Sequence, residues 1–161
     1  MQFVEEIHLN SLTSVESGTF RNLVNLKKVY LPKATIIYSE AFSGCISLQE
    51  VEIPLVETLN GNKIFYNCTS LSNLVLTKLT TLTSTGGELF YNCVSFDTIS
   101  LGSTPPKTFN ANVFTNRNSD RIMKLELPQP SDYQTYDDNT DIPGDAIGDG
   151  KWCGIELNIN P

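Results

Sequence analysis

The sequence is poor in basic residues and in histidine: it has 11 Lys and Arg, 18 Asp and Glu, and one His in 161 residues. The formal net charge of -7 offers no basic surface, so nucleic acid and anionic membranes are disfavoured as partners. No apolar run approaches the roughly 20 residues of a membrane-spanning helix. The opening MQFVEEIHLN lacks the basic and apolar regions of a signal peptide. We therefore expect no membrane insertion.

The chain also lacks the motifs of common catalytic and cofactor sites. A catalytic triad needs histidine beside a nucleophile, but His8 lies at an outward position of an expected strand. There is no phosphate-binding loop, dinucleotide fingerprint or C-x-x-C zinc spacing. Outward carboxylates such as Glu50 and Glu52 keep a hydrolase open as the weakest alternative. The sequence predicts a protein that is not an enzyme, with no cofactor, catalytic residue or metal.

What the chain does contain is an internal repeat. Five phenylalanines lie 22, 23, 25 and 24 residues apart, at Phe20, Phe42, Phe65, Phe90 and Phe114. Each begins a seven-residue phrase, and the phrases are FRNLVNL, FSGCISL, FYNCTSL, FYNCVSF and FTNRNSD. Apolar residues at the first, fourth and seventh positions predict one or two tight helical turns, too short to be stable unless they pack on neighbours. The fifth phrase is degenerate, because Arg117 and Asp120 replace its apolar residues.

A second pattern follows each phrase. Segments such as LKKVYLP, LQEVEIP and LSNLVLT alternate apolar and polar residues, which predicts one short strand per repeat with one face buried. The inward pairs are Ile7 and Leu9, Val29 and Leu31, Val51 and Ile53, Leu74 and Leu76, Ile99 and Leu101, and Leu125 and Leu127. A further apolar pair, such as Ala34 and Ile37, predicts a second, irregular rung. Repeats of this size must stack on one another to enclose a core.

The phrase F-x-x-C-x-S-L, followed by x-x-V-x-L-P and an apolar rung, resembles the BspA-like leucine-rich repeats of bacterial surface antigens over residues 5–101. The later TPPKTF, LELP and Trp152 are similar to the closing segment of Bacteroides-type members. The resemblance implies a repeat solenoid: a right-handed stack of short parallel β-strands with short helical or 3-10 turns, about five repeats plus a C-terminal cap. It also implies a secreted or cell-surface protein that binds a protein, glycan or matrix surface.

The expected domain has two parts. Residues 1–128 form the leucine-rich repeat solenoid, and residues 129–161 form an irregular acidic loop and a C-terminal capping segment of the same domain. In KWCGIELN, Trp152, Ile155 and Leu157 have strand spacing and should close the end of the stack. In the acidic loop, Asp137, Asn139 and Asp141 alternate as in a calcium loop, but Ile142 and Gly148 stand where an EF-hand needs Gly and Glu. A solvated loop is the favoured interpretation.

Three of the four cysteines share one repeat position. Cys45, Cys68 and Cys93 should stack as a column of small, buried, reduced side chains, because disulfide geometry is specific and an in-register column is better explained by packing. Cys153 lies outside the column and is interpreted as a lone thiol of the cap. Asn67 begins a glycosylation sequon, but its position in the core phrase favours an unmodified side chain.

The strand face is where every repeat contributes outward residues at fixed spacing. The predicted binding stripe comprises the central row His8, Tyr30, Glu52, Val75, Ser100 and Glu126, with Lys28, Glu50 and Asn73 of the parallel row Glu6, Lys28, Glu50, Asn73, Thr98 and Lys124. Tyr30 is the expected anchor for a protein or glycan ligand, since Tyr is enriched in binding hot spots. Two alternatives remain: Tyr30 is simply a cross-strand neighbour of His8 and Glu52, and the whole stack is a structural spacer within a longer surface protein.

Overall fold

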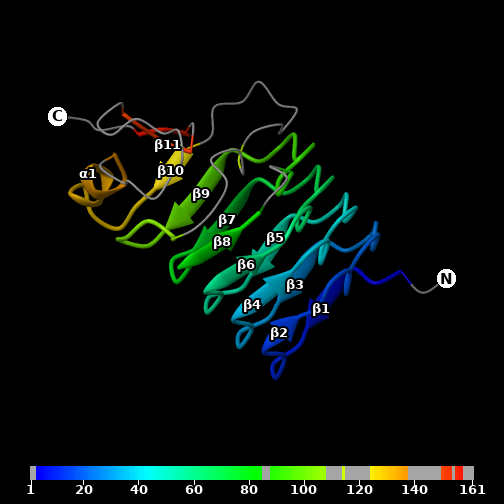
Figure 1. The fold of residues 1–161 in the computed structure, drawn as a ribbon. Coiled ribbons are helices and arrows are strands. Elements are labelled where there is room, and N and C mark those ends of the chain that lie inside the picture. The colour runs from blue at the N-terminus through cyan, green and yellow to red at the C-terminus, as the bar shows by residue number, and fades with distance from the viewer. Residues whose placement is uncertain are drawn as a thin grey trace.

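The computed structural model describes residues 3–84, 88–107, 114, 124–137, 150–153 and 155–157. The chain winds into successive coils stacked along one axis, with the N-terminus at one end of the stack (Figure 1). This is the predicted parallel β-solenoid of about five turns, with very little helix among the described residues.

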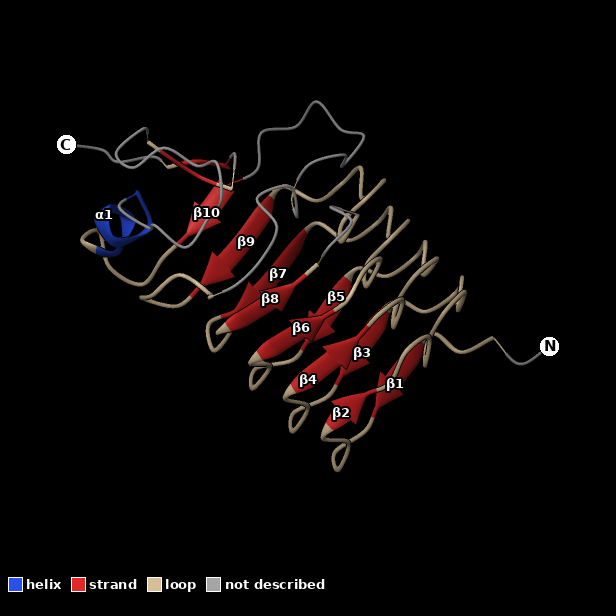
Figure 2. Cartoon of the chain, in the orientation of Figure 1, coloured by secondary structure: helices blue, strands red, loops and turns tan. Residues whose placement is uncertain are grey.

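Six strands line one side of the coils, which we call the strand face (Figure 2). They are β1 (Glu6–His8), β3 (Lys28–Tyr30), β5 (Glu50–Glu52), β7 (Asn73–Leu76), β9 (Thr98–Leu101) and β10 (Lys124–Glu126). They pair in parallel as two three-stranded sheets, β1-β3-β5 and β7-β9-β10. The predicted inward residues of the second to fifth strands are buried, and so is Leu125 of β10. Leu127, directly after β10, is half-buried. At the first rung, Ile7 is half-buried and Leu9 is exposed, because β1 pairs only with β3.

A second row of strands forms the lateral face. It is one continuous parallel sheet of β2 (Ser14–Val15), β4 (Ile36–Tyr38), β6 (Thr58–Asn60) and β8 (Thr81–Thr83), and Lys107 continues it through a bridge to Thr81. The prediction of an irregular second rung is therefore wrong. The repeats stack in register here, so that even two-residue segments such as Ser14–Val15 find parallel partners in the next coil.

The Phe phrases form hydrogen-bonded turns rather than the predicted helical turns. Residues two positions after the first four of these Phe residues have positive φ, at Asn22 (60°), Gly44 (77°), Asn67 (59°) and Asn92 (56°). Each is the third residue of a turn closed by a hydrogen bond from the fourth residue to the Phe carbonyl, as from Cys45 N–H to Phe42 O at 3.1 Å. Positive φ at this position is typical of type II turns, favours Gly or Asn, and interrupts a right-handed helix.

The phenylalanines build the centre of the core as one column of stacked rings. Phe42 and Phe65 have ring centroids 5.3 Å apart, Phe65 and Phe90 are 5.5 Å apart, and Phe114 extends the column at 5.7 Å from Phe90. The degenerate fifth phrase therefore still contributes its aromatic ring.

The cysteines at the repeat position form a second buried column. The Sγ atoms of Cys45, Cys68 and Cys93 donate to the carbonyl oxygens of Phe20, Phe42 and Phe65 at 3.1, 3.2 and 2.8 Å. Each thiol thus bonds to the coil before its own, which links successive repeats. All four cysteines are free and buried, as predicted.

The C-terminal segment contains α1 (Asp132–Asp137) and the antiparallel pair β11 (Lys151–Trp152) and β12 (Ile155–Glu156). The sequence predicted one strand here; instead the chain reverses at Cys153, which has a φ of 52°. Trp152 is fully buried and its ring packs 5.7 Å from Phe114 and 5.1 Å from Tyr136. The division into a solenoid and a cap at residue 129 stays a proposal, which these contacts support. The calcium-loop residues Asn139 and Asp141 and the side chain of Asp137 lie outside the described residues.

Candidate binding surface

The register of the strand face brings the predicted outward rows together. In the first sheet Glu6, Lys28 and Glu50 are successive partners, as are His8, Tyr30 and Glu52. In the second sheet Asn73 pairs with Thr98, and Val75, Ser100 and Glu126 follow one another. The binding role of these residues stays a prediction.

A first depression of about 420 Å³ is centred on the β1-β3-β5 sheet. It is lined by Glu6, His8, Lys28, Val29, Tyr30, Glu50 and Glu52. Five of the nine predicted stripe residues therefore surround one hollow. The ring of Tyr30 lies 5.9 Å from the ring of His8, at an interplanar angle of 50°.

A second depression of about 310 Å³ adjoins the first at the junction between β5 and β7. Its lining residues are Glu50, Val51, Glu52, Ile53, Pro54, Asn73 and Val75. The two hollows share Glu50 and Glu52 and therefore adjoin across the rungs, and we call the two together the groove. The side chain of Val75 is exposed at its edge, although its neighbours along the row are polar.

The second depression lies where the strand face is interrupted. Among the described residues, no backbone hydrogen bonds join β5 to β7, whereas the lateral sheet is continuous through the same coils.

The charges in the first depression are unequal. Three carboxylates, Glu6, Glu50 and Glu52, face one ammonium group, Lys28. Lys28 Nζ lies 2.9 Å from Glu50 Oε2, and this hydrogen bond raises the pKa of Lys28 and lowers the pKa of Glu50. The lowered pKa of Glu50 is the opposite of what a general acid requires.

The remaining stripe residues lie beyond the groove. Ser100 Oγ donates to Glu126 Oε2 at 2.6 Å, so these two side chains bond to one another between β9 and β10. The structure thus gathers the N-terminal seven stripe residues around the two depressions and leaves Ser100 and Glu126 as a separate pair. No group of three or more His, Cys, Asp or Glu side chains suited to a metal ion occurs among the described residues.

Comparison with known proteins identifies the repeat. The family model described as "BspA type Leucine rich repeat region (6 copies)" matches residues 3–127. The chain belongs to the BspA-type leucine-rich repeat family. The six copies agree with the six strands of the strand face, whereas the predicted count of about five repeats followed the five Phe phrases.

A solved structure has the same fold as this BspA-type chain. The crystal structure of a T. pallidum leucine-rich repeat protein superposes with a TM-score of 0.54 at 19% sequence identity, covering 79% of this chain and 72% of that one. No curated protein matches the sequence. Leucine-rich repeat proteins are typically non-enzymatic modules that mediate protein interactions. Within the described part of the chain, no helix is long and apolar enough to cross a membrane.

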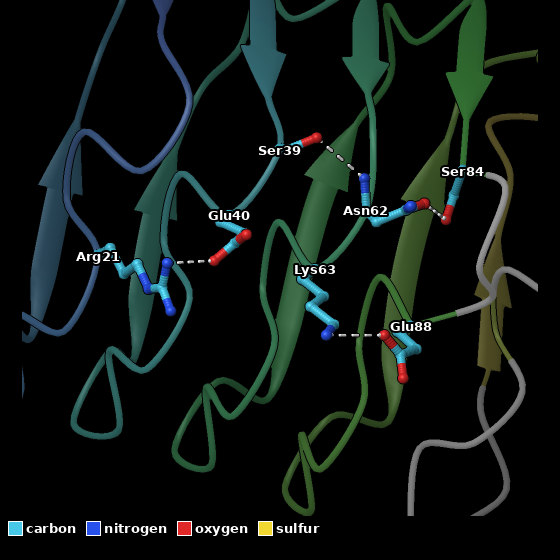
Figure 3. A network of polar contacts seen from close by, with 7 residues as sticks. All are labelled: Arg21, Ser39, Glu40, Asn62, Lys63, Ser84 and Glu88. Atoms are coloured by element: carbon cyan, nitrogen blue, oxygen red, sulfur yellow. Dashed lines mark hydrogen bonds and ion pairs between the residues drawn. The ribbon is translucent and has the colours of Figure 1, made fainter.

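The BspA-type repeats also carry polar contacts that the sequence did not predict. At the corners between lateral strands and Phe phrases, Arg21 pairs with Glu40 at 2.7 Å and Lys63 with Glu88 at 3.3 Å (Figure 3). Nearby, the Asn62 side chain accepts a hydrogen bond from Ser84 Oγ at 3.2 Å. Each of these contacts joins one coil to the next. They indicate cohesion of the stack rather than a ligand site, because each charge or polar group shown is met by the adjacent repeat.

Apart from Glu6 of the parallel row, four lining residues of the groove were not predicted as site residues: Val29, Val51, Ile53 and Pro54. Ile53 was assigned to the core because it follows the inward pattern, and it is indeed buried. No sequence signal distinguishes these residues, because Pro32 follows β3 as Pro54 follows β5, and β3 still pairs with β5.

Proposed function

We propose that this chain is a non-enzymatic binding module of a secreted or cell-surface protein, whose strand face recognises a protein, glycan or matrix surface. The observation that carries the proposal is the groove formed by the two adjoining depressions over β1, β3, β5 and β7. It combines an aromatic side chain, unbalanced charge and an exposed apolar residue on a stacked scaffold. Binding sites characteristically combine such groups on a rigid framework.

The family supports this proposal in two ways. Leucine-rich repeats generally mediate protein interactions, and BspA-type members are typically surface-associated. The adhesin-like role and the surface location are our extension to this chain. The predicted site residues are proposed to act as one surface, with Tyr30 as its anchor.

The test is a binding screen against extracellular matrix proteins and a glycan array, run with matched pairs of variants. Tyr30→Ala and Glu52→Lys alter the groove, whereas Tyr38→Ala and Glu57→Lys make the same changes on the lateral side of the coils. We expect the groove variants to lose binding and the lateral variants to keep it, with all four melting within a few degrees of the parent.

Two outcomes would contradict the proposal. If lateral and groove variants weaken binding equally, the strand face is not the recognition surface. If the parent chain binds no component of either screen, the spacer alternative gains the support that the binding module loses.

A further inference from the structure

The two depressions differ in chemistry although they share a wall. The first is lined by three carboxylates, one lysine and Tyr30. The second adds the apolar side chains of Val51, Ile53, Pro54 and Val75. A ligand that lies along the row of outward residues therefore meets an acidic, aromatic hollow and then an apolar one.

We propose that the groove binds an extended peptide segment with a Lys or Arg side chain over Tyr30 and an apolar side chain, three residues away, against Pro54 and Val75. The proposal rests on the binding function proposed above and names the chemistry of its partner.

Charge complementarity identifies the first side chain. Lys28 is engaged by Glu50 at 2.9 Å, and Glu6 has His8 as its neighbour at 3.7 Å, which is an ion pair only when the imidazole is protonated. The carboxylates of Glu6 and Glu52 thus leave an excess of negative charge around the hollow. A cationic side chain offsets this excess, and an anionic or sulfated group would be repelled by it.

The aromatic ring of Tyr30 favours the same class of side chain. Arg and Lys cations bind at the faces of aromatic rings, within about 6 Å of the centroid, and they do so more strongly where carboxylates lie nearby to share the charge. Tyr30 is half-buried in the middle of the depression, between His8 and Glu52 in the row. Its position gives a long cationic side chain an apolar surface for its methylenes and a carboxylate for its head.

The apolar hollow identifies the second side chain. Val75 is 51% exposed, which for one isolated residue would need no explanation. Here it lies at the rim of a depression with Pro54, which is also exposed, and with the buried Ile53. A Leu, Ile or Val side chain of the peptide would cover this apolar surface.

The stacking of the coils sets the spacing between the two side chains. Tyr30 and Val75 lie two coils apart, and the lateral strands of these coils, β4, β6 and β8, pair directly at about 4.8 Å per step, so the coils are offset by roughly 10 Å. A polyproline II segment rises about 3.1 Å per residue and returns to the same face every third residue, after about 9 Å. A β-strand returns after two residues and about 6.8 Å. The match favours a cation-x-x-apolar sequence.

The experiment is an NMR titration of the isotope-labelled chain with short peptides. The lead probe is acetyl-Gly-Arg-Pro-Pro-Leu-Gly-amide, and the comparison probes replace Arg by Gln, replace Leu by Ser, or place Leu directly after Arg. We expect millimolar binding of the lead probe, with shifts confined to β1, β3, β5 and β7. Each comparison probe should bind about fivefold or more weakly, and added salt should weaken the probes that keep Arg more than the probe with Gln.

Variants of the chain complete the test. Tyr30→Ala should weaken the lead probe about tenfold, and Glu52→Gln should do so about threefold while reducing its salt dependence. Glu57→Gln removes one carboxylate from the lateral side and should change nothing. Equal binding of all four probes, or no binding of any, overturns this inference.

These failures remain distinguishable from failure of the proposed function. If Tyr30→Ala still abolishes binding to a matrix or glycan ligand, the strand face remains the recognition surface. If the four peptides bind equally well, only the cation-x-x-apolar assignment is wrong. Both the proposed function and the peptide assignment would be wrong only if a ligand bound the Tyr30→Ala and Glu52→Lys variants as tightly as the parent chain.

Discussion

The same coils build the strand face and the lateral face, yet the two faces differ in how they use polar side chains. On the lateral side, Thr83 Oγ1 donates to Asn60 Oδ1 at 2.9 Å, and Thr35 and Thr80 donate to carbonyl oxygens of the preceding coil at 3.3 and 3.2 Å. The corresponding sheet is continuous. On the strand face six of the twelve outward residues are charged, Glu6, Lys28 and Glu50 among them are about half exposed, and the sheet is interrupted.

The difference separates cohesion from recognition. Hydroxyl and amide groups that bond to the next coil are already satisfied and offer little to a ligand. Exposed charges contribute little to stability, so a strand-face position can vary in charge without weakening the stack. We infer that the lateral face and its corners hold the repeats together and leave the strand face available for a partner.

The largest expected effect comes from a substitution in the aromatic column, because the column packs beneath both faces and its loss should destabilise both. Phe65 is fully buried between Phe42 and Phe90, with centroids at 5.3 and 5.5 Å. Phe65→Ala should cost about 3–5 kcal/mol of unfolding free energy. Equilibrium denaturation measures this loss. A loss below about 1 kcal/mol would mean that the stacked column does not carry the stability assigned to it.

The next effect is the low reactivity expected of the buried thiols in the cysteine column. Burial raises the pKa of Cys45 to about 11 and also raises the pKa of Cys68, and thiolate is the reactive form. At pH 8 the native column should therefore react with a thiol reagent at least about a hundredfold more slowly than the denatured chain. Denaturation without reductant should release all four thiols. Recovery of two or fewer would establish a disulfide and refute the packed column.

The sequence predicted the parts of this design that repeat in register and missed those that depend on stacking. Val29, Leu74 and their equivalents alternate with outward residues, so both rows of the strand face follow from the sequence pattern alone. The lateral strands were predicted as irregular because two or three residues give too little alternation to recognise a strand. The gap between β5 and β7 was also missed, since VEIP and LSNLVL both have the pattern of ordinary strands and only the relative placement of whole coils separates them.

A smaller effect on stability compares one substitution on the lateral face with one on the strand face. Thr83→Val preserves the branched shape but removes the hydrogen bond to Asn60, and it should cost about 1 kcal/mol of unfolding free energy. Glu52→Gln on the strand face should change stability by less than about 0.5 kcal/mol. Chemical denaturation of the two variants side by side measures the difference. If Glu52→Gln proved the more destabilising change, the strand face would be a cohesive surface, and the division of roles between the faces would be wrong.

The smallest effect is confined to one ion pair of the groove. The hydrogen bond from Lys28 lowers the pKa of Glu50 in the folded chain. Its contribution to stability is therefore present above the ordinary pKa of a Glu carboxyl and is lost as the pH falls through the lowered folded value. Because both groups are exposed and screened by salt, the titration of Glu50 is a sharper readout than the melting temperature.

Carboxyl-carbon NMR of the parent chain should show Glu50 titrating below the usual range of glutamate, and Lys28→Met should raise its pKa back towards that range. Lys27→Met is the matched control, because Lys27 is the neighbouring residue but pairs with Glu5 at 3.0 Å. It should leave Glu50 unchanged. If Lys27→Met moved the titration of Glu50 as far as Lys28→Met, the lowered pKa would reflect the overall charge of the face. The strand face would then lack the local pairing of Lys28 with Glu50, and Lys28 would compete with a cationic ligand for Glu6 and Glu52 as well.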